Sequence, residues 1–245
     1  NLTLISNDGP NYTIIDGNNY PGPGIPTGGV IEMGHNSIVT GFTIRNGEGF
    51  TAGGIQVTGN AVINNCIIKN NTAVNYSSSL GSGGGISIGA SAQYVTIIKS
   101  IIYENTSWNY GGGISISGDE TSLVQIINSV IYDNLAGTTI SNNFADFKGG
   151  GISLEYGNLR VVNSIITNNI FYNLSNQISV IGLYQIGNDV DLQYNATGYN
   201  FYHESSYSGP IDLIYSDNYS FDNSFVNSNN GNFNLQSSSN QIDAG

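Results

Sequence analysis

The feature that most constrains the fold is a glycine-rich hexapeptide that recurs along the chain. Gly-Gly-Gly-Ile-Ser-Ile occupies residues 83–88, and close copies follow at Gly111–Ile116 and Gly149–Leu154, with a shorter form at Gly53–Val57. A unit that returns in this way is typical of repeat proteins, in which each repeat packs on its neighbours. We therefore interpret the chain as an array of stacked repeats.

A second motif follows each copy after a polar turn. It consists of an apolar residue, two spacers, a small or apolar residue, one spacer, an isoleucine, two spacers and an asparagine. Its copies are Ile63–Asn71, Ile97–Asn105, Ile126–Asn134 and Val161–Asn169, with an earlier variant at Val39–Gly47. The segments from the asparagine to the next glycine pair differ in length, so we expect the variation at one corner of each repeat.

Alternation with a period of two indicates that the repeats are built from short β-strands. β-Branched residues hold the apolar positions, and Gly or Asn stands at each turn. Parallel stacking of such strands, about 4.8 Å apart, buries an apolar face that a single repeat would leave exposed. The sequence therefore predicts an all-β fold, a single-stranded right-handed parallel β-helix (β-solenoid).

This fold predicts rows of identical residues inside the coils. Two rows of isoleucine are expected: Ile55, Ile86, Ile114 and Ile152, and Ile44, Ile68, Ile102, Ile131 and Ile166. A row of asparagines should form a ladder of side-chain amides, and we expect its members to adopt left-handed backbone geometry: Asn71, Asn105, Asn134 and Asn169. Cys66 shares its row with Ser100, Ser129 and Ser164, and we interpret this row as small core filler.

The single repeat register favours one elongated domain over residues 1–245. We expect opening coils at 1–47, regular repeats at 48–169 and irregular C-terminal coils or a cap at 170–245, where the glycine motif is lost. Strand-like runs continue in the last region at Ile178–Tyr184, Val190–Tyr194 and Ile211–Tyr215. Because the sequence opens directly in a strand-like segment, we also expect neighbouring domains of a longer chain.

The composition excludes several partners. Lys and Arg number 5 against 17 Asp and Glu, which gives a net charge of −12, and such a field repels nucleic acids and anionic membranes. No apolar run approaches the roughly 20 residues that cross a bilayer, so we expect no membrane insertion. Cys66 is the only cysteine, which rules out a disulfide within the chain. The acidic, Asn-, Ser- and Tyr-rich composition favours an extracellular or cell-surface location.

Several segments resemble β-helix repeats of bacterial surface proteins. Asn1–Gly17, Gly41–Gly47 and the paired Gly-Gly-Gly-Ile and Ile-x-x-Asn motifs are similar to polymorphic-outer-membrane-protein-like repeats. Phe225–Gly245 is similar to the segment that closes such helices ahead of an anchoring or sorting domain. The resemblance implies a secreted protein with the pectate-lyase-like superfold. It implies no single activity, because this scaffold hosts lyases, epimerases, glycosidases, adhesins and stalks.

The first candidate site is the outward stripe beside the second isoleucine row. On successive coils it should carry Asp16, Arg45, Lys69, Tyr103, Tyr132 and Thr167. Arg45, Lys69, Tyr103 and Tyr132 would suit a polysaccharide lyase, in which a cation neutralises the uronate carboxylate and a base takes the C5 proton. The structural alternative is that Asp16 offsets Arg45 while the two tyrosine rings stack as cross-strand partners.

The second candidate site is a pair of carboxylates. Glu104 and Asp133 should lie on successive coils, where two close negative charges repel each other unless a cation bridges them or one takes up a proton. A calcium ion could bind both, or the pair could act as the carboxylates of a glycosidase. The structural alternative is that the two side chains are splayed and solvated.

The third candidate site is the variable corner. The segment 106–110 is short and lies between the longer segments 72–82 and 135–148, so it should form the floor of a cleft. The floor carries Trp108 and Tyr110, and the walls would bring Tyr76, Phe144 and Phe147. Aromatic faces beside Asn, Ser and Asp suit stacking on sugar rings. Alternatively, these rings cover the edges of the coils.

The sequence thus favours a secreted or cell-surface module that binds a polysaccharide, a cell-surface glycan or another surface, as an adhesin or display domain without catalysis. The alternatives are a polysaccharide lyase or glycosidase acting in a surface groove, and a structural stalk. No cofactor is required for the first hypothesis, and calcium is an optional ligand. A continuous basic groove would favour a lyase, an aromatic cleft would favour binding, and an even polar surface would favour a stalk.

Overall fold

The computed structural model describes most of the first 172 residues and short strands beyond them. The described ranges are 2–18, 28–74, 82–137, 149–167 and 169–172, followed by the later strands given below. These ranges contain strands and turns and no helix, which confirms the predicted all-β class. Accordingly, no helix in the described part of the chain is long and apolar enough to cross a membrane.

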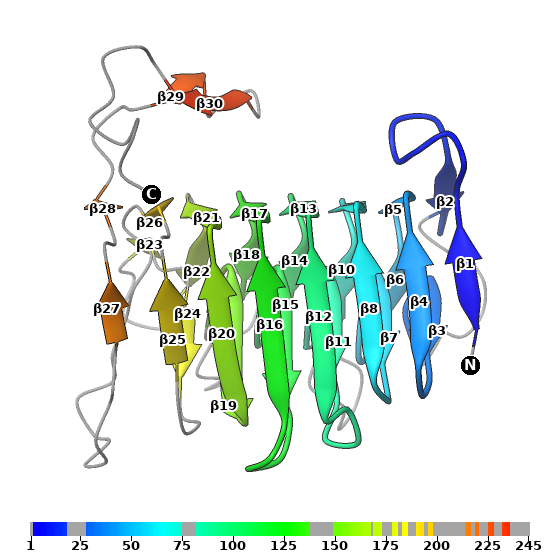
Figure 1. Cartoon of the computed structure of the whole chain (residues 1–245), viewed down its shortest axis with the longest axis horizontal. Coiled ribbons are helices and arrows are strands. Elements are labelled where there is room, and N and C mark those ends of the chain that lie inside the picture. Colours follow the sequence, from blue (N-terminus) through cyan, green and yellow to red (C-terminus); the bar gives the residue numbers. More distant parts are fainter. Residues whose placement is uncertain are drawn as a thin grey trace.

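Four sheets run along the molecule, and each regular coil adds one strand to each sheet (Figure 1). Sheet A contains β1 (Thr3–Ile5), β4 (Ser37–Thr40), β8 (Ala61–Asn64), β12 (Tyr94–Ile98), β16 (Leu123–Ile127), β20 (Asn158–Val162), β25 (Val190–Gln193) and β27 (Ile214–Ser216). Sheet B contains β2 (Ile14–Asp16), β5 (Thr43–Arg45), β9 (Ile67–Lys69), β13 (Ile101–Tyr103), β17 (Val130–Tyr132), β21 (Ile165–Thr167), β26 (Ala196–Thr197) and β28 (Tyr219–Ser220).

The other two sheets are shorter. Sheet D contains β6 (Glu48–Gly49), β10 (Thr72–Ala73), β14 (Thr106–Ser107), β18 (Leu135–Ala136), β22 (Ile170–Tyr172) and β23 (Ile178–Val180). Sheet C contains β3 (Ile31–Met33), β7 (Ile55–Val57), β11 (Ile86–Ile88), β15 (Ile114–Ser117), β19 (Ile152–Tyr156) and β24 (Leu183–Gln185). A separate pair is formed by β29 (Phe225–Asn227) and β30 (Asn232–Leu235).

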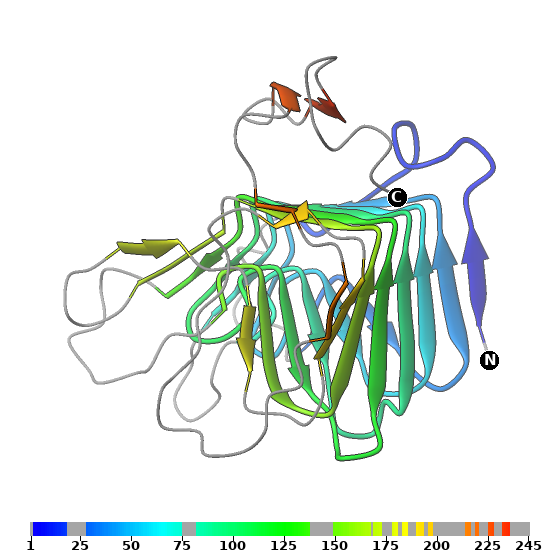
Figure 2. The ribbon, with the colours of Figure 1, turned by 60° about the vertical axis from the view of Figure 1, so that its left-hand side comes forward.

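The chain winds through the sheets in the order A, B, D, C and returns to sheet A one coil further along. In Figure 1 the chain rises through sheet A at the front, crosses the top through sheet B and descends at the back while it advances toward the left. This sense of winding is right-handed. Figure 2, turned toward the helix axis, shows the successive coils superimposed. The predicted right-handed parallel β-helix is therefore confirmed.

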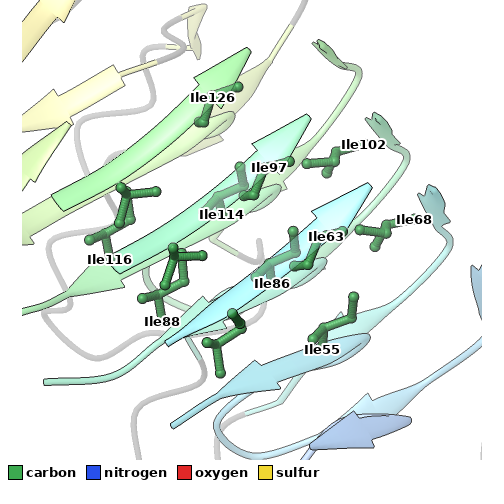
Figure 3. Close-up of a cluster of buried hydrophobic side chains, with 14 of the residues drawn as sticks. Ile55, Ile63, Ile68, Ile86, Ile88, Ile97, Ile102, Ile114, Ile116 and Ile126 are labelled. Carbon is green, nitrogen blue, oxygen red and sulfur yellow. The ribbon is translucent and has the colours of Figure 1, made fainter. Parts of the chain in front are cut away.

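The core consists of the predicted isoleucine rows. Ile102, for example, pairs with Ile68 on one side and with Ile131 on the other, and all three are fully buried. The sheet C row is equally buried at Ile55, Ile86, Ile114 and Ile152, and the residues of both rows face the same interior (Figure 3). Sheet A adds a third inner row, which includes Ile63, Ile97 and Ile126. Each coil thus covers the apolar face of the next one.

The asparagine ladder is also present and buried. The Oδ1 atom of Asn105 accepts hydrogen bonds from the backbone N–H of Asn71 at 3.1 Å and from its Nδ2 at 2.9 Å. The Nδ2 atom of Asn105 donates to Asn134 Oδ1 at 3.0 Å and to the Ile68 carbonyl at 2.9 Å. The same pattern continues from Asn134 to Asn169. The ladder thus satisfies polar groups that have no access to water.

The backbone geometry predicted for the ladder was wrong by one position. The left-handed residue is the one that precedes each ladder position, with φ values of 54°, 53°, 52° and 51° at Asn46, Asn70, Glu104 and Asp133. Asn71, Asn105 and Asn134 do not have positive φ. The chain turns at this residue, which is exposed or partly exposed, and the turn directs the following side chain inward, where its amide can bond to the next coil.

The Cys66 row is a second ladder, which we had interpreted only as filler. The backbone N–H of Cys66 donates to Ser100 Oγ at 3.1 Å, that of Ser100 to Ser129 Oγ at 3.2 Å, and that of Ser129 to Ser164 Oγ at 3.1 Å. The buried Sγ of Cys66 lies 3.3 Å from the Asn64 carbonyl, and burial raises the pKa of this thiol. The corner between sheets A and B is therefore hydrogen-bonded in the same manner as the corner between B and D.

The three glycines of the hexapeptide form the corner that leads into sheet C. The first has a positive φ, +58° at Gly111, which favours glycine. The second leaves no room for a side chain, because a Cβ atom on Gly112 would lie 2.4 Å from the carbonyl oxygen of Gly150. The third, Gly113, abuts the Asn134 amide, 3.1 Å from where its Cβ would stand. The two sequence motifs are therefore packed against each other.

The two ends of the array differ from its middle. At the start, β1 and β2 pair with β4 and β5 and so form the first strands of sheets A and B. Toward the end, β24 to β28 still add parallel strands, whereas β23 pairs antiparallel with β22, and β29 with β30 (Figure 1). These strands overlap the three predicted C-terminal runs. The boundaries at residues 47 and 169 remain predictions.

Replacing Asn105 by alanine should lower the free energy of unfolding by about 1 to 3 kcal/mol, because the buried N–H of Asn71 loses its acceptor while the Ile68 carbonyl and Asn134 Oδ1 each lose a donor. Asn64→Ala is the matched control, since Asn64 lies partly exposed on the outer side of sheet A. Urea unfolding of both variants measures the difference. Equal losses would contradict the stabilising role of the ladder.

Candidate functional site

The outward stripe of sheet B is formed as predicted. The strand register places Asp16 beside Arg45, Arg45 beside Lys69, and Lys69 beside Tyr103. The row continues through Tyr132 to Thr167. All four residues of the lyase hypothesis therefore lie in one row on one face of the helix.

The contacts within the stripe are mostly internal to it. Arg45 Nε donates to Asp16 Oδ2 at 2.8 Å, and this hydrogen bond holds the pKa of the Asp16 carboxyl below its ordinary value. The Tyr103 and Tyr132 rings stack with their centroids 4.8 Å apart and 7° between their planes. Lys69 Nζ lies 5.3 Å from the centroid of the Tyr103 ring. These contacts are those expected from the structural alternative.

The protonation of Tyr132 bears on the lyase hypothesis. Its side chain is nearly buried, and burial raises the pKa of the phenol well above its ordinary value, with further contributions from Tyr103, Asp133 and Glu104. A phenol that keeps its proton at neutral pH cannot take one from a substrate. The raised pKa therefore makes Tyr132 a weak candidate for the base of a lyase.

The two carboxylates occupy the left-handed turn positions between sheets B and D. Glu104 is exposed and Asp133 is partly buried, with φ values of 52° and 51°. Within the described ranges no group of three or more His, Cys, Asp or Glu residues could hold a metal ion. A calcium ion at this pair would need further oxygen ligands from carbonyls, Asn side chains or water. The calcium site and the glycosidase pair remain predictions.

The short segment of the variable corner is fixed to the preceding coil. The N–H of Trp108 donates to the Ala73 carbonyl at 2.9 Å, and the Tyr110 carbonyl accepts from Gly83 N at 2.8 Å. Burial alternates along the segment: Trp108 and Tyr110 are partly exposed, whereas Ser107 and Asn109 are buried. This alternation directs the two aromatic side chains to the outer side of the coil.

The walls of the predicted cleft lie outside the described residues. Tyr76 falls within 75–81, and Phe144 and Phe147 fall within 138–148. The cleft that these residues would form with Trp108 and Tyr110 therefore remains a prediction. Asn109 adds one observation to it: its buried Nδ2 has no hydrogen-bond partner within the described part of the chain.

The sequence reasoning missed a groove on the outer face of sheet A. It has a volume of about 340 Å³ and is lined by Asn36, Ser37, Ile38, Asn60, Ala61, Val62, Tyr94 and Thr96. The sequence contained one signal for this groove: the polar turn that precedes Tyr94 is longer than the equivalent turn of the preceding coil.

No protein-family model matches the sequence, and the searches of curated proteins and of solved structures found no match.

Proposed function

We propose that this β-helix is a secreted or cell-surface module that binds glycans without cleaving them, in an adhesin or display role. The observation that carries the proposal is the outward placement of Trp108 and Tyr110 on the short segment of the variable corner. The resemblance to polymorphic-outer-membrane-protein-like repeats supports a surface location and a longer parent chain.

The scaffold favours binding at the corner rather than on the strands. Strand positions are fixed by the ladders and by the inner rows, so their outer side chains stand in stacked lines. At the corner, by contrast, the connections vary in length while their ends remain anchored. A rigid scaffold with variable loops is the usual arrangement for recognition. Trp and Tyr rings stack on the C–H faces of sugars and lose little conformational entropy when they do so.

The lyase alternative draws its support from the stripe of Arg45, Lys69, Tyr103 and Tyr132. Two observations weigh against it. The faces of the tyrosine rings contact each other and Lys69, and the guanidinium of Arg45 is paired with Asp16. In addition, a net charge of −12 repels the polyuronates on which lyases act. We therefore prefer a binding function to a catalytic one.

The proposal predicts that Trp108→Ala loses glycan binding while its free energy of unfolding falls by no more than about 1 kcal/mol, because a partly exposed ring contributes little to the core. A polysaccharide panel with the purified domain measures binding, and thermal unfolding measures stability. Tyr12→Ala is the control, since Tyr12 is an exposed aromatic residue in the first coil. This control should bind like the wild type.

Two results would overturn the proposal. The first is a wild-type domain that binds no member of the panel and a Trp108→Ala variant that unfolds at a much lower temperature, which would assign the ring to the coil edge and the protein to the structural stalks. The second is an increase in absorbance from unsaturated products during incubation with a polyuronate, which would establish a lyase.

A further inference from the structure

The groove on sheet A is formed by a step between neighbouring coils. The turn 58–60 leads into β8, whereas the longer turn 89–93 leads into β12. In the register Val95 pairs with Ala61, so Tyr94 extends β12 by one residue beyond the start of β8. Side chains of β4 and β8 line the groove beside this ledge. Figure 1 shows β4, β8 and β12 side by side in sheet A.

The aromatic residue on the ledge is held in place through its backbone. Asn60 Oδ1 accepts hydrogen bonds from the N–H groups of Gln93 and Tyr94, both at 3.0 Å. The Tyr94 side chain is nevertheless 61% exposed. Asn60 also lines the groove, and no hydrogen bond from its Nδ2 to another residue of the described ranges is formed. The site thus combines a fixed backbone, an open ring and amide donors.

The chemistry of the lining is mixed and uncharged. Apolar atoms come from Ile38, Val62 and the Tyr94 ring, while Asn36, Ser37 and Thr96 provide polar groups. The tyrosines of sheet B differ in this respect, because their faces are already stacked on each other. The volume of about 340 Å³ lies at the lower end of the range of about 300 to 1,000 Å³ for small-ligand sites.

We propose that this groove binds a sugar unit of a neutral glycan, with the Tyr94 ring against the sugar face and Asn36, Asn60 and Thr96 as partners for its hydroxyl groups. The neutral class follows from charge: the described residues that line the groove include no cation to pair with a carboxylate or sulfate, and the net charge of −12 disfavours polyanions. This inference extends the proposed glycan-binding function to a second surface and rests on it.

The test uses the whole domain and four neutral or acidic probes: cellohexaose, mannohexaose, chitohexaose and hexagalacturonate. Calorimetric titration should show binding of at least one neutral hexasaccharide and none of hexagalacturonate. Tyr94→Ala should weaken that binding at least about tenfold, the loss expected for a central aromatic contact. Tyr156→Ala is the matched control, because Tyr156 is 59% exposed and does not line the groove. It should leave the affinity unchanged.

Trp108→Ala, titrated in parallel, separates this inference from the proposed function. If Trp108→Ala loses affinity and Tyr94→Ala does not, the groove inference is wrong and the corner site stands. The reverse result supports the groove and removes the corner site. A wild-type domain that binds none of the neutral probes overturns both. Self-association that Tyr94→Ala abolishes, measured by sedimentation, would assign the groove to a second copy of the chain and overturn the sugar assignment.

Discussion

Replacing Ile102 by aspartate should prevent the domain from folding or lower its free energy of unfolding by more than about 4 kcal/mol. Ile102 is fully buried in the middle of the sheet B row, between Ile68 and Ile131. Ile102 belongs to the cluster of buried apolar side chains, where a carboxylate would be cut off from water and would have no cation in the described part of the core to pair with. Because every coil packs on the next, the loss should extend to neighbouring coils as well.

Ile101→Asp is the matched control. Ile101 is the same residue type on the same strand, one position earlier, and it is partly exposed on the outer side of sheet B. We expect it to be folded, with only a modest loss of stability. Soluble expression and thermal unfolding of both variants decide the question. A soluble Ile102→Asp protein with the wild-type melting temperature would show that the two faces of β13 had been reversed.

The interior of this protein could be predicted because the same residues recur in the same order in each repeat. The motif Ile-x-x-Asn specifies an inward isoleucine and an inward amide. Parallel stacking then leaves one register in which all copies of the motif are equivalent. Ile68, Ile102 and Ile131 therefore align, and Asn71 bonds to Asn105. The register of the outward stripe followed from the same rule.

The turn geometry was harder to predict, because sequence preference points to the wrong residue. Asn is the usual residue for left-handed conformation, yet Glu104 and Asp133 take that role and Asn105 and Asn134 do not. The ladder explains this placement, because the side chain of Asn105 forms hydrogen bonds inside the coils and the residue before it makes the turn. Similarly, the small size of Ser100 predicted its place in the core, but it did not predict that its hydroxyl accepts a hydrogen bond from the backbone N–H of Cys66.

The outer surface was the least predictable part, because it depends on differences between coils. The groove at Tyr94 arises where one turn is longer than the turn before it, so no single repeat contains it. The stacking of Tyr103 on Tyr132 could be anticipated from the register, but its consequence, that the ring faces are covered, required the geometry. A function carried by the outer surface therefore could not be predicted from the repeat motifs alone.

The second large effect is expected at the glycine corner. Gly112→Ala should lower the free energy of unfolding by at least about 3 kcal/mol, although it adds only one methyl group. The new Cβ would lie 2.4 Å from the Gly150 carbonyl oxygen and 2.5 Å from the carbonyl carbon and oxygen of Leu135. All of these are backbone atoms of adjacent segments, so no side chain can rotate away. Gly112 also donates its N–H to the Gly149 carbonyl at 3.1 Å, and a shift of the corner would break this hydrogen bond.

Gly89→Ala provides the matched control for Gly112→Ala. Its nearest non-bonded atom, the Val57 carbonyl oxygen, lies 3.6 Å from the added Cβ, which is an ordinary contact. Neither glycine has a positive φ, so the comparison isolates steric exclusion from backbone preference. Gly89→Ala should be neutral or slightly stabilising, because alanine restricts the unfolded chain. If thermal unfolding showed equal stability for the two variants, the coils could move apart at this corner, and the close stacking of the glycines would not be what sets the spacing of the array.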